Sequence, residues 1–558
     1  IAMNEPLRIF CVNLQRYVDI EGGESLGDIA RRLGRELSQV PVCAFVNNCN
    51  QDLRFPVYAP KQVEFFDVAS APGQRVVRTS LVFMLYKALH DVLPGMRLKV
   101  EHSISHGLFC RIMNSEGEAL VADAATVELI RGRMEAIAAA DMPILRHEKL
   151  TAEVLEKFRD QNMPDKIRLL DTLHNLYTVY YSLDGVCDSY LSPLVPSTGH
   201  LRVFGLEPYH DGMLLLGPDP QNPQQPSRPV EQPKMFAAFT ETLRFDRVIK
   251  AGDVGLLNQA VQRRDTAMLI NVAEALHSKR LGVIAQSIAQ RGSRIVLIAG
   301  PSSSGKTTTA KRLGIHLMTN MLTPKMISLD DYFVDRHTTP RDADGELDYE
   351  SLYALDLERL QADLTALLRG EEVNLPTYSF ELGRRVDKDH RMRLKPDEIL
   401  LIEGIHGLNP ELTASLPQQH IFKVYVSALT TLNIDDHNWI PTTDNRLLRR
   451  IVRDYKYRGT SALDTIRRWP SVRRGEEKWI FPYQENADAT FNSSLIFELG
   501  VMRDYALPVL RQVPHNRIEY AEAYRLIRFL EYFEPVPASQ IPSTSLLREF
   551  LGGSSFNY

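Results

Sequence analysis

The sequence predicts an α/β protein: a doubly wound parallel sheet in the C-terminal part, preceded by a small β-grasp module and a second α+β module. After residue 290, short apolar runs rich in β-branched residues alternate with helical patterns, the order that produces a parallel sheet. These include a helical pattern over 357–368 and a strand-like run over 422–426. The first 66 residues instead follow a β-β-α-β-β order. At 558 residues the chain is also too long for one hydrophobic core, so several modules are expected.

The composition is that of an ordinary globular protein. Hydrophobic residues make up 44% and charged residues 24%, with a net charge of -5, which excludes a disordered or broadly basic chain. The five cysteines form no C-x-x-C pair, and this favours reduced thiols over a disulfide framework. No apolar run approaches the roughly 18 residues that span a bilayer, and the first residues lack a signal-peptide pattern. We therefore expect a cytoplasmic location and no membrane partner.

The first module is predicted to span residues 1–69. Residues 7–18 alternate as a hairpin does, Ser25 precedes a short helical pattern, and residues 42–46 and 62–66 are strand-like. This order is typical of a ubiquitin-like β-grasp, with an unrelated small α+β module as the alternative. No residue in this module carries chemistry of its own.

The second module is predicted to span residues 70–235, and it contains two histidines four positions apart, His102 and His106. On a helix such a pair shares one face and could hold a metal ion. A structural or surface role is the alternative. The Pro- and Gln-rich stretch 220–233 has no apolar periodicity and is the clearest linker candidate.

The third module, residues 236–558, begins with a helical stretch over 240–290 and is organised around a glycine- and serine-rich loop. The apolar run 295–298 leads directly into the pattern G-x-x-x-x-G-K-T of a phosphate-binding loop. Its glycines let successive N–H groups turn inward at a helix start, where the helix dipole also favours an anion. Lys306 is expected to reach the β- and γ-phosphates of a nucleotide, and the Thr307 hydroxyl to bind Mg²⁺. The predicted nucleotide-binding residues are Gly300, Ser302, Ser303, Ser304, Gly305, Lys306, Thr307 and Thr308.

Two further strand-like runs end in acidic residues. Residues 325–329 lead into Asp330 and Asp331, and residues 398–405 include Glu403. Strand ends of a parallel sheet meet at the ligand-binding edge, so Asp330 could accept a proton from a substrate hydroxyl and Glu403 could hold Mg²⁺. Capping a helix is the alternative role for the aspartate pair.

A basic helix is predicted over residues 444–459. Arg446, Arg449, Arg450 and Arg453 recur at i, i+3, i+4 and i+7, so their guanidinium groups line one face. Like charges stacked in this way repel unless an anion lies among them, which indicates a lid over a transferring phosphoryl group. A solvated charged face is the alternative.

Five motifs in order resemble those of the uridine kinase and phosphoribulokinase family: GPSSSGKT, SLDDYF, PTYSF, IEGIHGLNP and RLLRRIVRD. The resemblance implies that Asp330 is the general base toward a 5′-hydroxyl. It implies that Arg449 and Arg453 act beside the phosphates together with Lys306. The acceptor contacts that it implies come from Asp348, Tyr378, Arg446 and Arg458.

The two front modules resemble parts of aminoacyl-tRNA synthetases. Residues 1–69 resemble the TGS domain of threonyl-tRNA synthetases, and residues 70–235 resemble the second additional domain of threonyl and alanyl enzymes. That domain completes its H-x-x-x-H with a Cys and a further His, and the matching positions here are Tyr190 and Leu194. Cys187 lies three residues from the expected place. We therefore expect a retained fold whose hydrolytic centre is lost.

One departure from the kinase family concerns the acceptor. The family carries a His five residues after the tyrosine equivalent to Tyr378, and here that position is Gly383. Losing one hydrogen-bonding group to the base leaves the substrate identity open. The insertion over residues 433–441 is also longer than in short uridine kinases, and it is expected to reshape the acceptor pocket or an oligomer contact.

Together these features predict a kinase that uses Mg²⁺ and ATP, with GTP as an alternative donor, to phosphorylate the 5′-hydroxyl of a nucleoside, foremost uridine. A phosphoribulokinase-like sugar kinase is the first alternative. The second is an RNA-linked regulator whose front modules bind tRNA-like RNA while the third module senses nucleotide. A homo-oligomer is expected.

Overall fold

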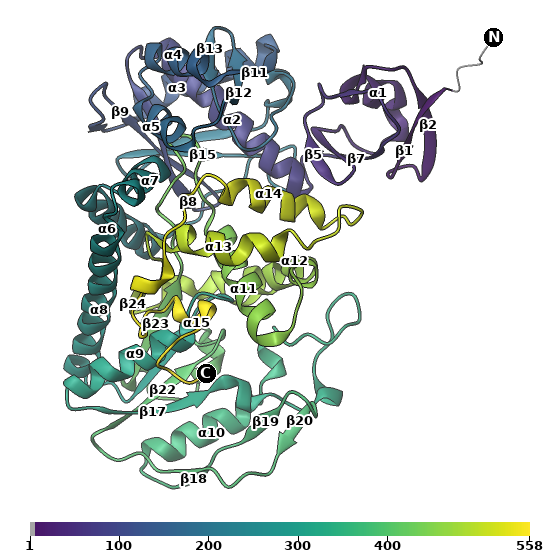
Figure 1. Cartoon of the computed structure of the whole chain (residues 1–558). Helices are drawn as coiled ribbons and strands as arrows, with labels where there is room; N and C mark the ends of the chain where they lie inside the picture. Colours follow the sequence, from purple (N-terminus) through teal and green to yellow (C-terminus); the bar gives the residue numbers. More distant parts are fainter. Residues whose placement is uncertain (1–5) are drawn as a thin grey trace.

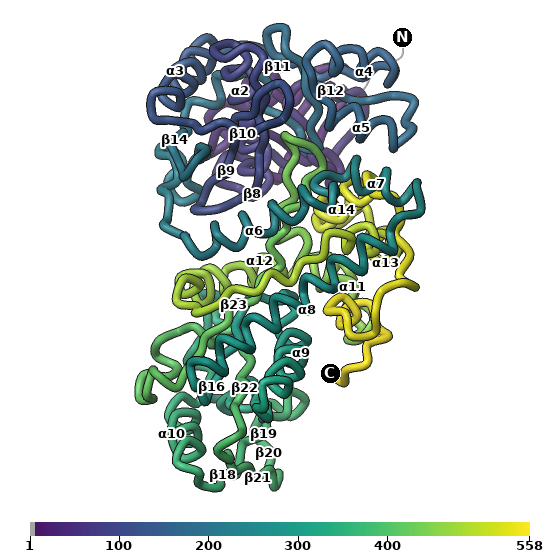
Figure 2. Tube along the Cα trace, turned by 90° about the vertical axis from the view of Figure 1, so that its left-hand side faces the viewer, coloured from purple at the N-terminus to yellow at the C-terminus, as the bar shows by residue number. Residues whose placement is uncertain are grey.

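The computed structural model describes residues 6–558, and Figure 1 shows the front modules at one end of the molecule and the large parallel sheet toward the other. In the turned view of Figure 2 the molecule is elongated, with the small strands β18 and β21 at the end opposite the front modules. The C-terminal segment runs back to the neighbourhood of α9 and β22 (Figure 1). Across residues 6–558, no helix combines the length and apolar character needed to cross a membrane.

The first module contains the predicted hairpin, helix and two later strands, and residues 49–51 add to its mixed sheet a fifth strand that was not predicted. β1 (Leu7–Cys11) forms an antiparallel hairpin with β2 (Arg16–Ile20) and pairs in parallel with β7 (Gln62–Phe66). α1 (Leu26–Leu33) begins after Ser25, whose hydroxyl accepts the N–H of Asp28. The other strands are β3 (Glu24–Ser25), β4 (Cys43–Val46), β5 (Cys49–Gln51) and β6 (Pro56–Val57).

The second module combines a long buried helix, α2 (Ala71–Val92), with two antiparallel sheets. One sheet has the order β10-β9-β15-β14, with β8 (Arg97–Ile104) paired to β9 (Gly107–Met113). The other has the order β11-β12-β13. The remaining elements are β10 (Ala119–Leu120), α3 (Ala124–Ala140), β11 (Ile144–Leu150), α4 (Thr151–Asp160), α5 (Pro164–Leu173), β12 (Tyr177–Leu183), β13 (Val186–Asp188), β14 (Gly205–Tyr209) and β15 (Gly212–Leu216).

Three successive helices connect the front of the chain to the large sheet: α6 (Pro233–Ile249), α7 (Val254–Gln262) and α8 (Thr266–Arg291). α6 starts with a proline in its first turn, where the missing N–H costs nothing. The predicted boundary between residues 235 and 236 therefore lies inside α6 rather than in the linker before it.

The large sheet is parallel throughout, with the order β17-β22-β16-β23-β24. Its middle strand β16 (Ile295–Ala299) is fully buried, because strands of a parallel sheet are covered on both faces. The predicted strands are confirmed as β16, β17 (Thr323–Ser328), β22 (Glu398–Glu403) and β23 (Ile421–Ser427). β24 (Ala489–Asn492) was not predicted, since its four residues show no apolar run.

Helices pack on both faces of this sheet, which confirms the doubly wound α/β class. The predicted helix over 357–368 is α10 (Leu357–Leu368). The other helices are α9 (Lys306–Thr319), α11 (Thr442–Arg458), α12 (Ala462–Trp479), α13 (Glu498–Leu510), α14 (Tyr520–Leu530) and α15 (Arg548–Leu551), and the short strands are β18 (Val373–Asn374), β19 (Thr377–Ser379), β20 (Arg384–Val386) and β21 (Arg391–Met392).

Candidate active site

The phosphate-binding loop connects the end of β16 to the start of α9. Ser303 and Gly305 both have positive φ, 60° and 92°, which gives the loop its tight path. A Cβ atom on Gly300 would lie 2.1 Å from the carbonyl oxygen of Val426, so only glycine fits there. The first N–H groups of α9 have no partner within the helix and face the loop side, an arrangement that suits a phosphate group.

Thr307 and Glu403 meet at the start of α9. The Thr307 hydroxyl donates to Oε1 of Glu403 at 2.8 Å, because β22, which ends in Glu403, pairs directly with β16. A hydroxyl and a carboxylate oxygen fit Mg²⁺, which binds proteins through one or two such ligands and takes the rest from phosphates and water. Within residues 6–558 no cluster of three or more His, Cys, Asp or Glu could hold a metal by itself.

Lys306 lies beside the same carboxylate. Its Nζ donates to the carbonyl oxygen of Pro301 at 3.2 Å. Burial lowers the pKa of Lys306, while the carboxylates of Glu403, Glu549 and Asp330 act in the opposite direction. The ammonium group is therefore placed among negative groups at the mouth of the loop, where it would pair with a phosphate.

Asp330 follows β17, the strand next to β22 in the sheet. Its backbone N–H donates to the Ser328 hydroxyl at 3.3 Å, so Ser328 is the cap of this turn and the Asp330 carboxylate is left free for chemistry. The residue is exposed at the edge of the sheet. Partial desolvation of its carboxylate, and then the negative charge of Glu403, raise the pKa of Asp330 to about 6. A carboxylate with this pKa suits a general base near neutral pH.

The basic helix is α11, and it differs from the predicted lid. Arg446 and Arg449 are almost wholly buried, with side chains 1% and 0% exposed. Arg446 forms a two-bond pair with Glu476, at 2.6 and 2.8 Å, and Arg449 forms one with Glu498, at 2.8 Å for both bonds. The repulsion that suggested a bound anion is thus relieved by two buried carboxylates. A solvated charged face is also excluded for this pair.

The two buried arginines hold the phosphate loop from behind. Arg446 donates to the carbonyl oxygen of Ser302 at 3.0 Å, and Arg449 donates to those of Ser303 and Ser304 at 3.3 Å. These contacts place both residues against the loop backbone, where they fix its shape. The Nη1 and Nη2 atoms of Arg446 are engaged by Glu476 and the loop, and the acceptor contact expected of this residue stays a prediction.

The other arginines of α11 remain near the open side. Arg450 donates to the Ser302 hydroxyl at 2.8 Å. Arg453 is half-buried and pairs with Asp454 at 3.1 Å, and Arg458 is exposed and lies 3.5 Å from the same carboxylate. Both of these guanidinium groups contribute positive charge around Asp330, Lys306 or Glu549.

Glu476 of α12 is a site residue that the sequence did not reveal. Besides Arg446, its Oε1 accepts the backbone N–H of Ser302 at 3.2 Å. The carboxylate is held ionised, because Arg446 and Arg473 lower the pKa of Glu476 against the effect of burial. Thirty residues separate Glu476 from Arg446, and no local pattern marks either as the partner of the other.

The C-terminal segment also reaches the phosphate loop and was not predicted to do so. A Cβ on Gly305 would lie 2.7 Å from the side chain of Leu546, so Leu546 packs directly on the loop. The Tyr558 hydroxyl lies 2.7 Å from that of Thr308, one of the predicted nucleotide-binding residues. Burial, and then Glu403, raise the pKa of the nearby Glu549 to about 7 against the pull of Arg453.

Two of the predicted acceptor residues, Tyr378 and Asp348, lie in the segments that follow β17. Tyr378 is buried between Phe333 and Phe380, with ring centroids 5.5 and 5.1 Å apart, and its N–H donates to Asp331 at 3.3 Å. Asp348 is half-buried, and its carboxylate accepts the N–H of Glu350 at 3.1 Å.

Gly383 lies in a turn beside this group with φ of 65°. A Cβ there would lie 2.4 Å from the guanidinium carbon of Arg336, so Arg336 fills the space that a side chain at 383 would need. Arg336 also donates to the Tyr349 hydroxyl at 3.2 Å and to the carbonyl oxygen of Phe380 at 3.1 Å.

The histidine pair of the second module is not a helical metal site. His102 lies on strand β8 and His106 in the turn after it, so the two side chains do not share a helix face. His102 is buried and stacks on Phe239 at 3.7 Å, and burial lowers the pKa of this imidazole to about 3. Tyr190 and Leu194 are both buried.

The fold and the site define a P-loop kinase. The profile of the phosphoribulokinase / uridine kinase family matches residues 295–495. The chain is 30% identical to the uridine kinase of Halobacterium salinarum over 192 residues. This aligned stretch covers 34% of this chain and 76% of that protein. The chain belongs to the phosphoribulokinase / uridine kinase family, whose members are nucleotide-binding phosphotransferases that generally use ATP and Mg²⁺.

A second relative matches the front of the chain. Threonine–tRNA ligase of Rubrobacter xylanophilus is 30% identical over 192 residues in the N-terminal portion, which is 34% of this chain and only 29% of the ligase. The predicted fusion of a kinase to a synthetase-like part is thus confirmed. A solved structure described as a possible uridine kinase from Bacillus stearothermophilus is 21% identical with a TM-score of 0.25, over 38% of this chain and 97% of its own.

Proposed function

We propose that this protein transfers the γ-phosphoryl group of ATP to the 5′-hydroxyl of a nucleoside, with uridine as the first candidate. The observation that carries this proposal is the position of Asp330 on the sheet edge that also bears Lys306 and Glu403. A plain nucleotide hydrolase has no need of a second carboxylate with a pKa of about 6 beside the loop. The uridine kinases among the relatives support the nucleoside as acceptor.

Each residue has a separate task in this proposal. The loop N–H groups and Lys306 bind the phosphates, while Thr307 and Glu403 would hold Mg²⁺, which neutralises phosphate charge when it is bound. Asp330 takes the proton of the acceptor hydroxyl as the oxygen attacks. Arg453 and Arg458 add positive charge beside the site. Arg449 acts through the loop backbone and not by direct contact with phosphate.

A sugar kinase of the phosphoribulokinase type is the second candidate, and Arg336 is the observation that favours it. This guanidinium fills the space beside Gly383 and has already used two of its donor groups on Tyr349 and Phe380. Its remaining donors would pair well with a carboxylate or phosphate on the acceptor. Asp348 and Tyr378 are proposed to contact the acceptor in either case.

The test is a screen of the purified full chain against nucleosides and pentose phosphates, with ATP and GTP as donors and Mg²⁺ present. Transfer to uridine or another nucleoside supports the first candidate. Transfer only to phosphorylated or carboxylated acceptors supports the second. ATP hydrolysis without any phosphorylated acceptor contradicts both and favours the RNA-linked regulator, for which salt-sensitive RNA binding by the full chain is the matching measurement. RNA binding and a homo-oligomer remain predictions.

A further inference from the structure

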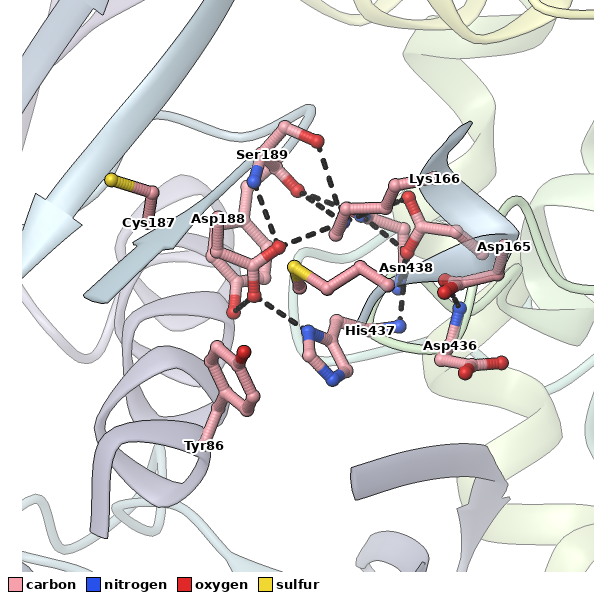
Figure 3. Close-up of polar contacts among 12 residues, drawn as sticks. Tyr86, Asp165, Lys166, Cys187, Asp188, Ser189, Asp436, His437 and Asn438 are labelled. Carbon is pink, nitrogen blue, oxygen red and sulfur yellow. Dashed lines mark hydrogen bonds and ion pairs between the residues drawn. The ribbon is translucent and has the colours of Figure 1, made fainter. Parts of the chain in front are cut away.

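A buried polar cluster joins the second module to the kinase module, and Figure 3 shows its side chains. The kinase module contributes the loop between β23 and α11, which includes the insertion noted in the sequence. We name this group the junction cluster. Figure 3 labels eight of its members, which are Tyr86, Asp165, Lys166, Asp188, Ser189, Asp436, His437 and Asn438. The ninth member is Asp435, which pairs with Lys166.

Lys166 and Asp188 are the centre of the junction cluster. The Lys166 ammonium lies 2.8 Å from Asp188 within its own module and 3.0 Å from Asp435 of the kinase loop. On its other oxygen, Asp188 accepts from Nδ1 of His437 at 2.6 Å. All four side chains are at most 4% exposed, so each charge depends on its partners.

The loop backbone is held as firmly as its side chains. The Asp436 N–H donates to the Asp165 carboxylate at 2.8 Å, and the Asp436 carbonyl accepts the N–H of Val100 on β8 at 2.8 Å. Asn433 donates to the Val100 carbonyl at 2.9 Å, and Asn438 donates to that of Ser189 at 2.9 Å. Residues 433–438 of the loop are therefore bonded to the second module through both backbone and side chains.

One of the positions that the resemblance to synthetases assigns to a hydrolytic centre lies beside this loop. Tyr190, which stands at one of the two lost ligand positions, donates its hydroxyl to Asp188 at 2.6 Å. Its pKa rises well above the ordinary value, through burial and then the Asp188 carboxylate. Tyr190 thus bonds to the same carboxylate that accepts from His437 of the kinase loop.

A second series of ion pairs links the second module to α11, the helix that follows the kinase loop. Asp444, in the first turn of α11, forms two bonds of 2.8 Å with Arg525 of α14. Arg525 also pairs with Glu522, which lies 3.7 Å from Arg75 on α2. The first turn of α11 is thus linked to the second module twice, through the loop that precedes it and through α14.

The next turns of α11 hold the phosphate loop through Arg446 and Arg450. A helix moves as a rigid unit, so a shift of its first turn displaces these guanidinium groups from the loop. We propose that the second module is a positioning device for the kinase: the junction cluster and the Arg75–Glu522–Arg525–Asp444 chain set the position of α11 and thereby the affinity of the phosphate loop for nucleotide.

The experiment uses the full chain and the variants Asp435→Asn and Arg75→Gln. Glu128→Gln is the matched control, because Glu128 pairs with Arg131 on the exposed face of α3 in the same module. Two readouts are taken: the dissociation constant for ATP, and hydrogen exchange of peptides that cover residues 442–458 in the absence of nucleotide. Neither readout uses an acceptor, so the result stands whether or not a nucleoside is phosphorylated.

We expect both variants to weaken ATP binding by about 5-fold or more and to speed exchange in 442–458, while the control changes neither. ATP binding within twofold of the parent in both variants overturns the proposal, even if exchange is faster, because the contacts would then only stabilise the fold. Should Asp435→Asn fail to fold, Arg75→Gln decides alone, since the Arg75 side chain is 36% exposed and its loss leaves no wholly buried charge unpaired.

A double-mutant cycle excludes a merely structural role. Arg75 and Arg450 belong to different modules, yet both act on the phosphate loop if the proposal holds. Combining Arg75→Gln with Arg450→Gln should then weaken ATP binding by less than the product of the two single effects. Effects that multiply fully would mean that Arg75 acts independently of α11, and would overturn the proposal.

Discussion

Asp330 shows how one position in a parallel sheet sets the chemistry of a carboxylate. The strand that precedes it pairs with the strand that ends in Glu403, so two acids share one edge. Although Asp330 is exposed, partial desolvation of its carboxylate by the protein around it and this second charge together raise its pKa to about 6. The residue is then mostly ionised at neutral pH and still basic enough to take a proton from a hydroxyl.

Replacing Asp330 by Asn should lower kcat by about 100- to 10,000-fold, because an amide cannot accept the proton. ATP affinity should change little, since Asp330 makes no contact with the loop backbone. Steady-state kinetics with the acceptor found in the screen, together with ATP titration, provide the measurement. Turnover near that of the parent protein would remove Asp330 from the role of base.

The pH dependence follows from the same residue. Asp330 must be deprotonated to act, so kcat/KM should fall as the pH drops below about 6, by about tenfold for each further pH unit. Above that pH the profile should be flat with respect to this group. A kcat/KM that stays constant from pH 7 down to pH 5 would argue against Asp330 as the essential base.

Arg336 is the residue on which acceptor choice is expected to depend. Arg336→Ala should raise the acceptor KM by about 10- to 100-fold and leave the KM for ATP unchanged, since the lost bond is charge-assisted and lies on the acceptor side. Arg384→Ala, which removes a nearby exposed arginine, is the control. Equal changes in both KM values would mean that the substitution disturbs the whole site.

At the scale of elements, the C-terminal segment supports the phosphate loop, a contact that the sequence did not predict. Its buried residues Leu546, Leu547 and Phe550 pack into the kinase core beside α9 and α11. The Phe550 ring lies 5.2 Å from the Arg449 guanidinium. The loop is thus held on one side by α11 and on the other by the segment that contains α15.

Tyr558→Phe should strengthen nucleotide binding by about 2- to 10-fold. The Tyr558 hydroxyl is hydrogen-bonded to the Thr308 hydroxyl. A nucleotide that bonds to Thr308 must first break this hydrogen bond, which costs binding free energy. Titration with ATP gives the affinity, and Tyr457→Phe is a control that leaves the Thr308 contact in place. Weaker binding in Tyr558→Phe would indicate that the tyrosine helps to hold the nucleotide instead.

At the scale of the whole molecule, the front modules and the kinase form one connected body through the junction cluster (Figure 3). The β-grasp module joins it too, since Asn48 donates to the carbonyl oxygen of His515 at 3.0 Å. Buried ion pairs of this kind cost desolvation energy, and they stabilise a fold only while every partner is present.

Lys166→Met should therefore lower the free energy of unfolding by about 3–5 kcal/mol, because it leaves Asp188 and Asp435 buried without their common cation. Urea denaturation of the full chain measures this. The exposed control Arg131→Gln should stay within about 0.5 kcal/mol of the parent protein. A loss for Lys166→Met as small as that of the control would mean that the aspartates are already solvated or protonated.

Local sequence patterns were sufficient to predict those parts of the structure that depend on residues close together in the sequence. The phosphate loop, four strands of the large sheet, α10 and the carboxylates at the strand ends followed from residues within a few positions of one another. Four strands and the helix of the first module were predicted in the same way, and the short strand Cys49–Gln51 was not. For the pair His102 and His106, spacing alone left a helical metal site and a structural role open, because it does not distinguish a helix from a strand followed by a turn, and the structure shows the strand and turn.

The sequence by itself therefore determined the fold class, the donor side and the family of this protein. Only the tertiary structure decided that Arg446 and Arg449 are buried behind the loop, that Glu476 and Tyr558 reach it, and that His437 enters the second module. The physical reason is distance along the chain. These contacts join residues from 30 to 250 positions apart, and no periodicity or spacing encodes which buried charge will meet which partner.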